Sequence, residues 1–264
     1  MGGVQLALNK NIDQVQSGKT NFDINDFDLE DDNDREDFDN KVDILFVLDQ
    51  SGSMSSYIQQ AKYTICKIVE KFKKKEYDLK FSLCTYIDHE PQYNILTDFT
   101  DLCSGKQIVE KLQTVIAGGG GDLPEAVMDG LRDGISKTSW RKATGKDEKS
   151  QRFLFHICDA PPHGKEYGFP SSDPLWTDNG CPCGTKREDI KNLLQLHDIK
   201  YFLIKPNGYI SKMEQLFKEC FENNYKDTIS LLDNIEQKDG KTDNKETKTQ
   251  MWEGVLNNIE KTIY

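Results

Sequence analysis

The hydrophobic pattern from residue 42 onward predicts strands that alternate with helices. "VDILFVL" at 42–48 is an almost unbroken apolar run, as expected for a strand covered on both faces. Residues 54–75 carry apolar side chains at helical spacing, and a second strand follows at 79–87. Another short strand, 93–99, comes after only a brief connection, so we expect it to pair with 79–87 as an antiparallel hairpin.

The same alternation continues toward the C-terminus. The remaining helices are predicted at 104–115, 123–138, 185–198 and 213–221, and the remaining strands at 152–158, 199–205 and 228–232. Strands that alternate with helices indicate the α/β class. We therefore expect a doubly wound, mainly parallel, Rossmann-like central sheet with one short antiparallel edge strand and helices on both faces.

The composition divides the chain into three parts. Residues 1–40 form an acidic N-terminal tail, residues 41–233 the α/β domain, and residues 234–264 a polar linker with a C-terminal amphipathic helix. The tail has too little apolar area to build a core, which favours a solvated segment. Its interleaved Phe, Leu and Ile side chains also suit docking on a basic, apolar partner surface, and both readings stay open.

The charge balance narrows the classes of partner. A net charge of -11 and an isoelectric point near 4.9 argue against nucleic-acid and anionic-membrane binding. The sequence has no signal-peptide pattern and no apolar run of membrane-spanning length. The cysteine count of 7 is odd, which favours free thiols over a disulfide framework. We expect a cytoplasmic protein with protein partners, and association with the cytoskeleton is one option.

Side chains with metal-binding oxygens follow the predicted strands. Asp49, Ser51 and Ser53 come after the first strand, Asp122 closes a run of glycines, and Asp159 follows the strand at 152–158. Loops at the carboxyl ends of parallel strands converge, and hard oxygen ligands suit Mg²⁺, Ca²⁺ or Mn²⁺ better than zinc. Each residue alone could be a helix cap or a turn residue. Together they favour a divalent-metal site.

The pattern Asp49-x-Ser51-Gly52-Ser53 after an apolar strand resembles the metal-ion-dependent adhesion site of von Willebrand factor A domains, and the resemblance spans about residues 42–233. "GGGGDLPEAVMDGL", "FHICDAPPHG" and "GCPCG" are similar to the A domains found beside alpha-kinase catalytic domains. The resemblance implies that Ser51 and Ser53 bind the metal directly, and that Asp49 and Asp159 bind it directly or through water. Asp122 stands where the family usually has a threonine ligand. Nothing in the remaining residues resembles a kinase domain, so kinase activity is not implied.

Other polar residues have the chemistry of metal ligands, but their sequence patterns favour structural roles. Cys181 and Cys183 are separated by one residue, and no second cysteine pair accompanies them, so their spacing argues against zinc at this segment and at the nearby His163. Glu125 and Asp129 are expected to be first-turn and surface acids of the helix at 123–138. The buried strand pattern around His156 predicts a core or sheet-face side chain.

Three functions from different classes fit these observations. The first is a non-catalytic protein–protein interaction or assembly module with a divalent ion, Mg²⁺ before Ca²⁺ or Mn²⁺, at Asp49, Ser51, Ser53, Asp122 and Asp159. Its partners would bind at the metal face, the acidic tail and the C-terminal helix. The second is a phosphoaspartyl phosphotransferase with Asp49 as nucleophile, although such enzymes need an acid at position 51 and a lysine nearby. The third is a structural subunit with a vestigial metal site.

Overall fold

The computed structural model describes residues 40–73, 77–89, 96–142, 150–168, 180–206 and 208–230. The predicted acidic tail and the predicted C-terminal linker and helix lie outside these residues. No helix within the described ranges is long and apolar enough to cross a membrane.

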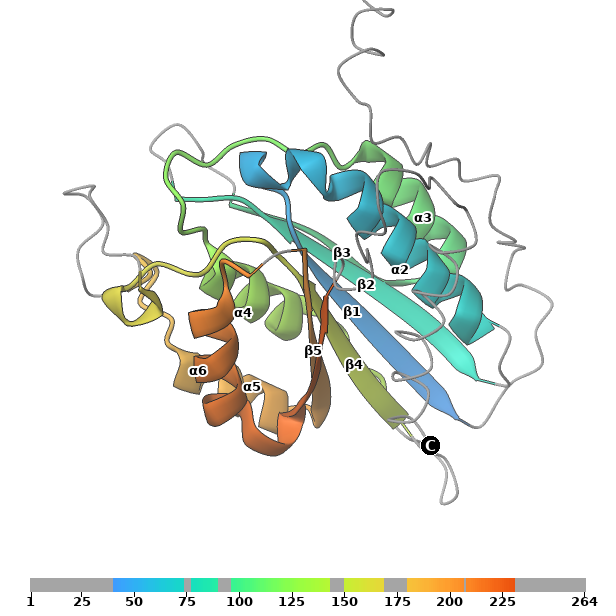
Figure 1. Ribbon diagram of the computed structural model, residues 1–264. Helices are drawn as coiled ribbons and strands as arrows, with labels where there is room; N and C mark the ends of the chain where they lie inside the picture. Colours follow the sequence, from blue (N-terminus) through green and yellow to red (C-terminus); the bar gives the residue numbers. More distant parts are fainter. Residues whose placement is uncertain are drawn as a thin grey trace, which may run out of the picture.

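A six-stranded sheet forms the centre of the domain, with the strand order β3-β2-β1-β4-β5-β6 (Figure 1). Neighbouring strands are parallel except β2 and β3, which are antiparallel. The predicted fold class is therefore confirmed, including the antiparallel edge strand. That edge strand begins later than the predicted 93–99. The strands are β1 (Lys41–Asp49), β2 (Asp78–Tyr86), β3 (Thr97–Cys103), β4 (Ser150–Ile157), β5 (Ile199–Lys205) and β6 (Tyr225–Ser230).

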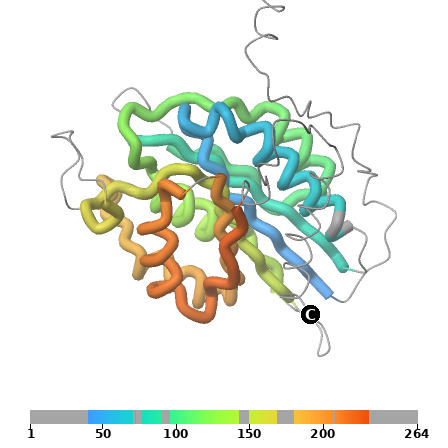
Figure 2. The backbone as a smooth tube through the Cα atoms, viewed as in Figure 1, coloured from blue at the N-terminus to red at the C-terminus, as the bar shows by residue number. Residues whose placement is uncertain are grey.

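Helices cover both faces of the sheet, as the tube through the backbone also shows (Figure 2). On one face lie α2 (Ile58–Lys73) and α3 (Gly105–Thr114), and on the other lie α4 (Val127–Lys137), α5 (Arg187–Leu196) and α6 (Ser211–Phe221). Short 3-10 helices occur at Gly52–Ser56, Lys165–Tyr167 and Glu222–Asn224.

Alternate side chains of β1 enter two separate hydrophobic cores. Phe46 belongs to the core under α2 and α3, where its ring stacks on Phe81 and Phe155. Leu45 and Val47 belong to the core under α4, α5 and α6. Because successive residues of a strand point to opposite faces, a strand that is covered on both sides must be apolar at nearly every position. This explains why the sequence from Val42 to Leu48 is apolar at every position except Asp43.

One arginine binds the amino-terminal ends of β1 and β2. Arg141 Nε donates to Asp43 Oδ1 at 2.6 Å, and the Arg141 backbone N–H donates to Asp43 Oδ2 at 2.7 Å. The same guanidinium forms an ion pair with Asp78 and donates to the Asp78 backbone carbonyl at 2.7 Å. Asp43 is fully buried, so the chain itself supplies the cation that this carboxylate needs.

The helix predicted for 123–138 starts at Val127, and this later start changes the role of its first residues. Glu125 and Asp129 are each only 3% exposed, so the expectation that they are surface acids is wrong. They lie where α4 packs against the sheet and against the loop after β4. His156 is fully buried between strands, which confirms it as a core residue.

Candidate metal centre at the carboxyl edge of the sheet

The four residues predicted around the ends of β1 and β4 form one connected chain of contacts. Asp49 is the last residue of β1 and fully buried, and its Oδ1 accepts a hydrogen bond from the Ser51 amide at 2.9 Å. The Ser51 and Ser53 hydroxyl oxygens lie 3.0 Å apart. Ser53 Oγ donates to Asp159 Oδ1 at 2.7 Å. We call Asp49, Ser51, Ser53 and Asp159 the oxygen cluster.

The glycine run is held against the oxygen cluster by backbone hydrogen bonds. Gly52 N–H donates to the Gly119 carbonyl at 2.7 Å, and Gly118 N–H donates to the Gln50 carbonyl at 2.8 Å. A Cβ on Gly52 would stand 3.0 Å from Gly119 O, so the close approach needs a residue without a side chain. The sequence motif therefore fixes the position of a loop far away in the chain.

Glu125 is a further acid beside the oxygen cluster, in contrast to the surface position expected from its sequence. Its side chain accepts a hydrogen bond from Ser51, and its backbone N–H donates to the Pro161 carbonyl at 3.0 Å. Gly120 lies so close that a Cβ there would be 2.6 Å from Glu125 Oε1. The only sequence signal was the glycine run just before it, because Pro124 and Glu125 read as an ordinary helix start.

Asp122 groups with a different set of side chains. A carboxylate oxygen of Asp122 and ligand atoms of Asp88 and His163 lie within 4.8 Å of one another. His163 Nε2 is 2.7 Å from Asp88 Oδ1, and both side chains are almost completely buried. The pKa of Glu125 is raised mainly by burial and by the charges of Asp49 and Asp88, and the charge of Asp122 adds a smaller contribution in the same direction.

The electrostatics of the oxygen cluster indicate a missing positive charge. Burial, with the neighbouring charges of Asp159 and Asp88, raises the pKa of Asp49 to about 7. Burial also raises the pKa of Asp159. Asp49 Oδ2 and Glu125 Oε2 are buried and accept no hydrogen bond from the described residues. Within that part of the chain, no lysine or arginine forms an ion pair with Asp49, Glu125 or Asp159.

This set of donors fits a hard divalent cation. Carboxylate and hydroxyl oxygens are the ligands that Mg²⁺ and Ca²⁺ prefer. A cation at this position would supply the positive charge that the buried carboxylates otherwise lack.

Comparison with known proteins identifies the family of the domain. Residues 43–167 match the family model of the von Willebrand factor A domain. Over 203 residues the sequence is 34% identical to Alpha-protein kinase vwkA of Dictyostelium discoideum, a match that covers 74% of this chain and 30% of the relative. The chain thus spans less than a third of that relative's length.

The fold is shared with solved structures of an adhesin. The pilus adhesin SpaC from Lactobacillus rhamnosus GG matches in two crystal structures, one of them in an open conformation, each with a TM-score of 0.51. The identities are 13% and 12%, and each match covers 85% of this chain and 30% of the adhesin. From the family match and the relative together, residues 43–167 belong to the von Willebrand factor A domain family.

Proposed function

We propose that this domain is a non-catalytic protein-interaction module that holds Mg²⁺ at the carboxyl edge of its sheet. The oxygen cluster is the core of the proposed site, and Asp122 and Glu125 add carboxylates from the glycine-rich side. The observation that carries the proposal is the buried Asp49 carboxylate, which lies among other acids and pairs with no lysine or arginine of the described residues. Membership of the von Willebrand factor A family supports it.

Contacts within the chain position each part of the proposed site. The Ser51 amide fixes the orientation of the Asp49 carboxylate, and the Ser53 hydroxyl links the end of β1 to Asp159 after β4. The Gly52–Gly119 hydrogen bond holds the glycine run beside them. When bound, the ion would offer a Lewis-acidic coordination position to a carboxylate of the partner protein.

The segments at the two ends of the sequence are also part of the proposal. The acidic tail at 1–40 and the amphipathic helix within 234–264 would add docking surface for the same partner, in a cytoplasmic assembly. Both segments lie outside the described residues, and they enter the proposal through their sequence patterns alone. The whole activity of the Dictyostelium relative is not carried over, because the match covers only 30% of it.

Titration calorimetry with Mg²⁺ tests the metal, comparing wild type with Asp49→Ala. We expect Asp49→Ala to lower Mg²⁺ affinity by about 10-fold or more, because the affinity of such sites rises with the number of charged ligands. Asp98→Asn is the matched control, since Asp98 is exposed and, among the described residues, forms an ion pair only with Lys111. Equal Mg²⁺ affinity in wild type and Asp49→Ala would refute the metal site.

Pull-down with Mg²⁺ or with a chelator tests the interaction. Proteins that bind through the ion should be retained by wild type in Mg²⁺, and lost both in chelator and with Asp49→Ala. An assay with an aryl phosphate as substrate tests the alternative function. Hydrolysis that requires Mg²⁺ and disappears in Asp49→Ala would show that the domain is a phosphotransferase and not an interaction module.

A further inference from the structure

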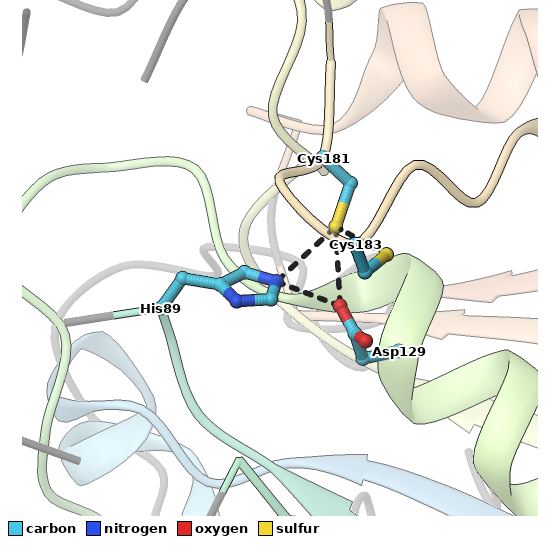
Figure 3. A group of neighbouring side chains, drawn as sticks. All are labelled: His89, Asp129, Cys181 and Cys183. Carbon is cyan, nitrogen blue, oxygen red and sulfur yellow. Dashed lines mark hydrogen bonds and ion pairs between the residues drawn. The ribbon is translucent and has the colours of Figure 1, made fainter. Parts of the chain in front are cut away.

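A second group of side chains, with a different chemistry, lies near the oxygen cluster. His89 follows β2, Asp129 lies in the first turn of α4, and Cys181 and Cys183 lie in the segment before α5 (Figure 3). One ligand atom from each residue lies within 4.8 Å of the others. We call these four residues the sulfur cluster.

The four side chains point toward a common centre. His89 Nε2 is 2.7 Å from Asp129 Oδ2 and 3.2 Å from Cys181 Sγ. Cys181 Sγ is 3.1 Å from the same carboxylate oxygen and 2.8 Å from Cys183 Sγ. In a tetrahedral zinc site with ordinary bond lengths, ligand atoms lie roughly 3.3–3.8 Å apart. For these four pairs, zinc geometry requires the two atoms to move apart by about 1 Å or less.

Further hydrogen bonds hold the ligands in this orientation. Arg132 Nη2 lies 2.7 Å from Asp129 Oδ1, which leaves the other oxygen of that carboxylate for the cluster. Arg132 Nη1 also donates to Thr185 Oγ1 at 3.0 Å, and the Thr185 amide donates to Cys183 Sγ at 3.4 Å. Groups that orient ligands from behind are a regular feature of metal sites.

The cluster also offers the donor types that zinc binds, in a place shielded from water. Asp129 is 3% exposed and Cys181 is 8% exposed. Cysteine sulfur, histidine nitrogen and carboxylate oxygen are the usual ligands of zinc in proteins, and four of them complete a tetrahedral site.

The backbone around the cysteines is shaped to present both sulfurs. Gly180 and Gly184 bracket "CPC" and have φ values of 97° and 75°, in the region that glycine alone adopts readily. The tight turn between them brings both Sγ atoms to the same side. Exchanging either glycine for a residue with a Cβ would strain that turn.

We propose that His89, Asp129, Cys181 and Cys183 bind one zinc ion, which fastens the segment before α5 to α4 and to the end of β2. Sequence spacing argued against zinc because the cysteine pair lacks a second pair. The fold supplies the other two ligands from distant elements instead. A redox pair would need only the two sulfurs, whereas here a carboxylate and an imidazole also converge on them.

Metal analysis of the full chain, purified under reducing conditions with added zinc, tests the proposal without any variant. We expect one zinc ion per chain. Replacement of zinc by Co²⁺ should give the absorption of a tetrahedral ion together with a sulfur-to-cobalt charge-transfer band, which an all-oxygen site cannot give. Protein that contains neither zinc nor this band, or that is isolated with a Cys181–Cys183 disulfide and no zinc, would overturn the proposal.

Variants then assign the ligands. Cys183→Ser should lose the ion and the charge-transfer band, whereas Cys220→Ser, a free cysteine outside the cluster, should keep both. Asp49→Ala should also keep the band, which separates this site from the oxygen cluster. Arg132→Gln should weaken zinc binding by roughly 10–100-fold against a competing chelator. A folded Cys183→Ser that retains a full zinc ion, or an Asp49→Ala that loses the band, would overturn the assignment.

Discussion

The two ends of β1 each bury a carboxylate, and the chain treats them differently. Asp43 near the start is fully buried and receives the Arg141 guanidinium at 2.6 Å. Asp49 at the end is equally buried, but its surroundings are the Ser51 amide and hydroxyl and other acids. Burying an unpaired charge is costly, so a buried carboxyl group either takes up a proton or pairs with a cation. At the start of β1 the protein provides that cation, and at the end a metal ion is expected to provide it.

Removing the cation at the start of β1 should give the largest effect. Arg141→Gln would leave Asp43 and Asp78 without their guanidinium, and breaking a buried pair in this way costs about 3–5 kcal/mol of unfolding free energy. Urea denaturation compares this variant with Lys142→Gln, the exposed neighbour, which should unfold like wild type. Equal stability of the two variants would show that Asp43 does not depend on Arg141.

Neutralising the carboxylate at the other end should have the opposite sign. In chelator, Asp49→Asn should stabilise the domain by about 1–3 kcal/mol, because a buried charge without a cation is replaced by a neutral amide. With excess Mg²⁺, wild type should be more stable than Asp49→Asn. Thermal melting of both proteins in chelator and in Mg²⁺ measures the two differences. A variant that is less stable than wild type in chelator would contradict the comparison.

His156 is a third buried titratable group, and unlike Asp43 and Asp49 it is expected to stay neutral and to need no cation. Its ring nitrogens lie 2.9 Å from Tyr86 OH and 2.8 Å from Tyr201 OH, and burial lowers its pKa from 6.5 to about 3. The folded pKa is below the unfolded one, so this stability is present above about pH 6.5 and is lost as the pH falls toward about 3. The loss between about pH 8 and about pH 5 should be about 2 kcal/mol.

Urea denaturation of wild type and His156→Gln, at both pH values and in chelator, measures the stability that His156 contributes. The chelator removes any effect of metal binding at the two proposed sites. The glutamine can still hydrogen-bond the two tyrosines but does not titrate. The difference in unfolding free energy between the variant and wild type should change by about 2 kcal/mol between the two pH values. An identical pH dependence in both proteins would show that His156 does not titrate as proposed.

At Asp122, where the chain departs from the usual threonine of the family, the expected effect is on binding affinity and not on stability. Its charge should tighten the ion and repel an acidic partner by ~1–4 kcal/mol at realistic dielectrics, which is ~10-fold or more in affinity. Calorimetry on Asp122→Thr should therefore show weaker Mg²⁺ binding and stronger binding of an acidic peptide. Unchanged Mg²⁺ affinity would make Asp122 a turn residue beside Asp88 and His163, with no role at the ion.

The smallest effect on stability is expected from the acidic tail. Deleting residues 22–39 should leave the melting temperature almost unchanged, because the tail's acids build no core. Association with a partner should weaken, and more strongly at low salt, where charges are less screened. A large drop in melting temperature would instead show that the tail packs on the domain.

The fold could be predicted from the sequence because its signals are local. The apolar run at 42–48 and the helical spacing at 54–75 each lie within one element, and their alternation defines the sheet. The start of α4 was misplaced because Pro124 and Glu125 are also typical of a helix's first turn. In the structure that stretch is extended enough for Glu125 to bridge to Pro162.

The candidate site could be predicted only where its residues follow a strand in a fixed motif. Asp49, Ser51 and Ser53 satisfy that condition, and Asp159 lies at the end of a neighbouring strand. The sulfur cluster does not satisfy it, since the approach of His89 and Asp129 to the "CPC" segment depends on how α4 packs against β2. Spacing rules detect ligands that are close in sequence, and these ligands meet only in three dimensions.

The place of β1 between β2 and β4 has a consequence for the time course of folding. Lys41 pairs with Ser150, so the central pairing of the sheet closes a very long loop, which is a slow event in parallel sheets. Asp49 and Asp159 come together only once this pairing exists. An ion bound between them would therefore leave the folding rate nearly unchanged and slow unfolding, so that its contribution appears in the lifetime of the folded domain.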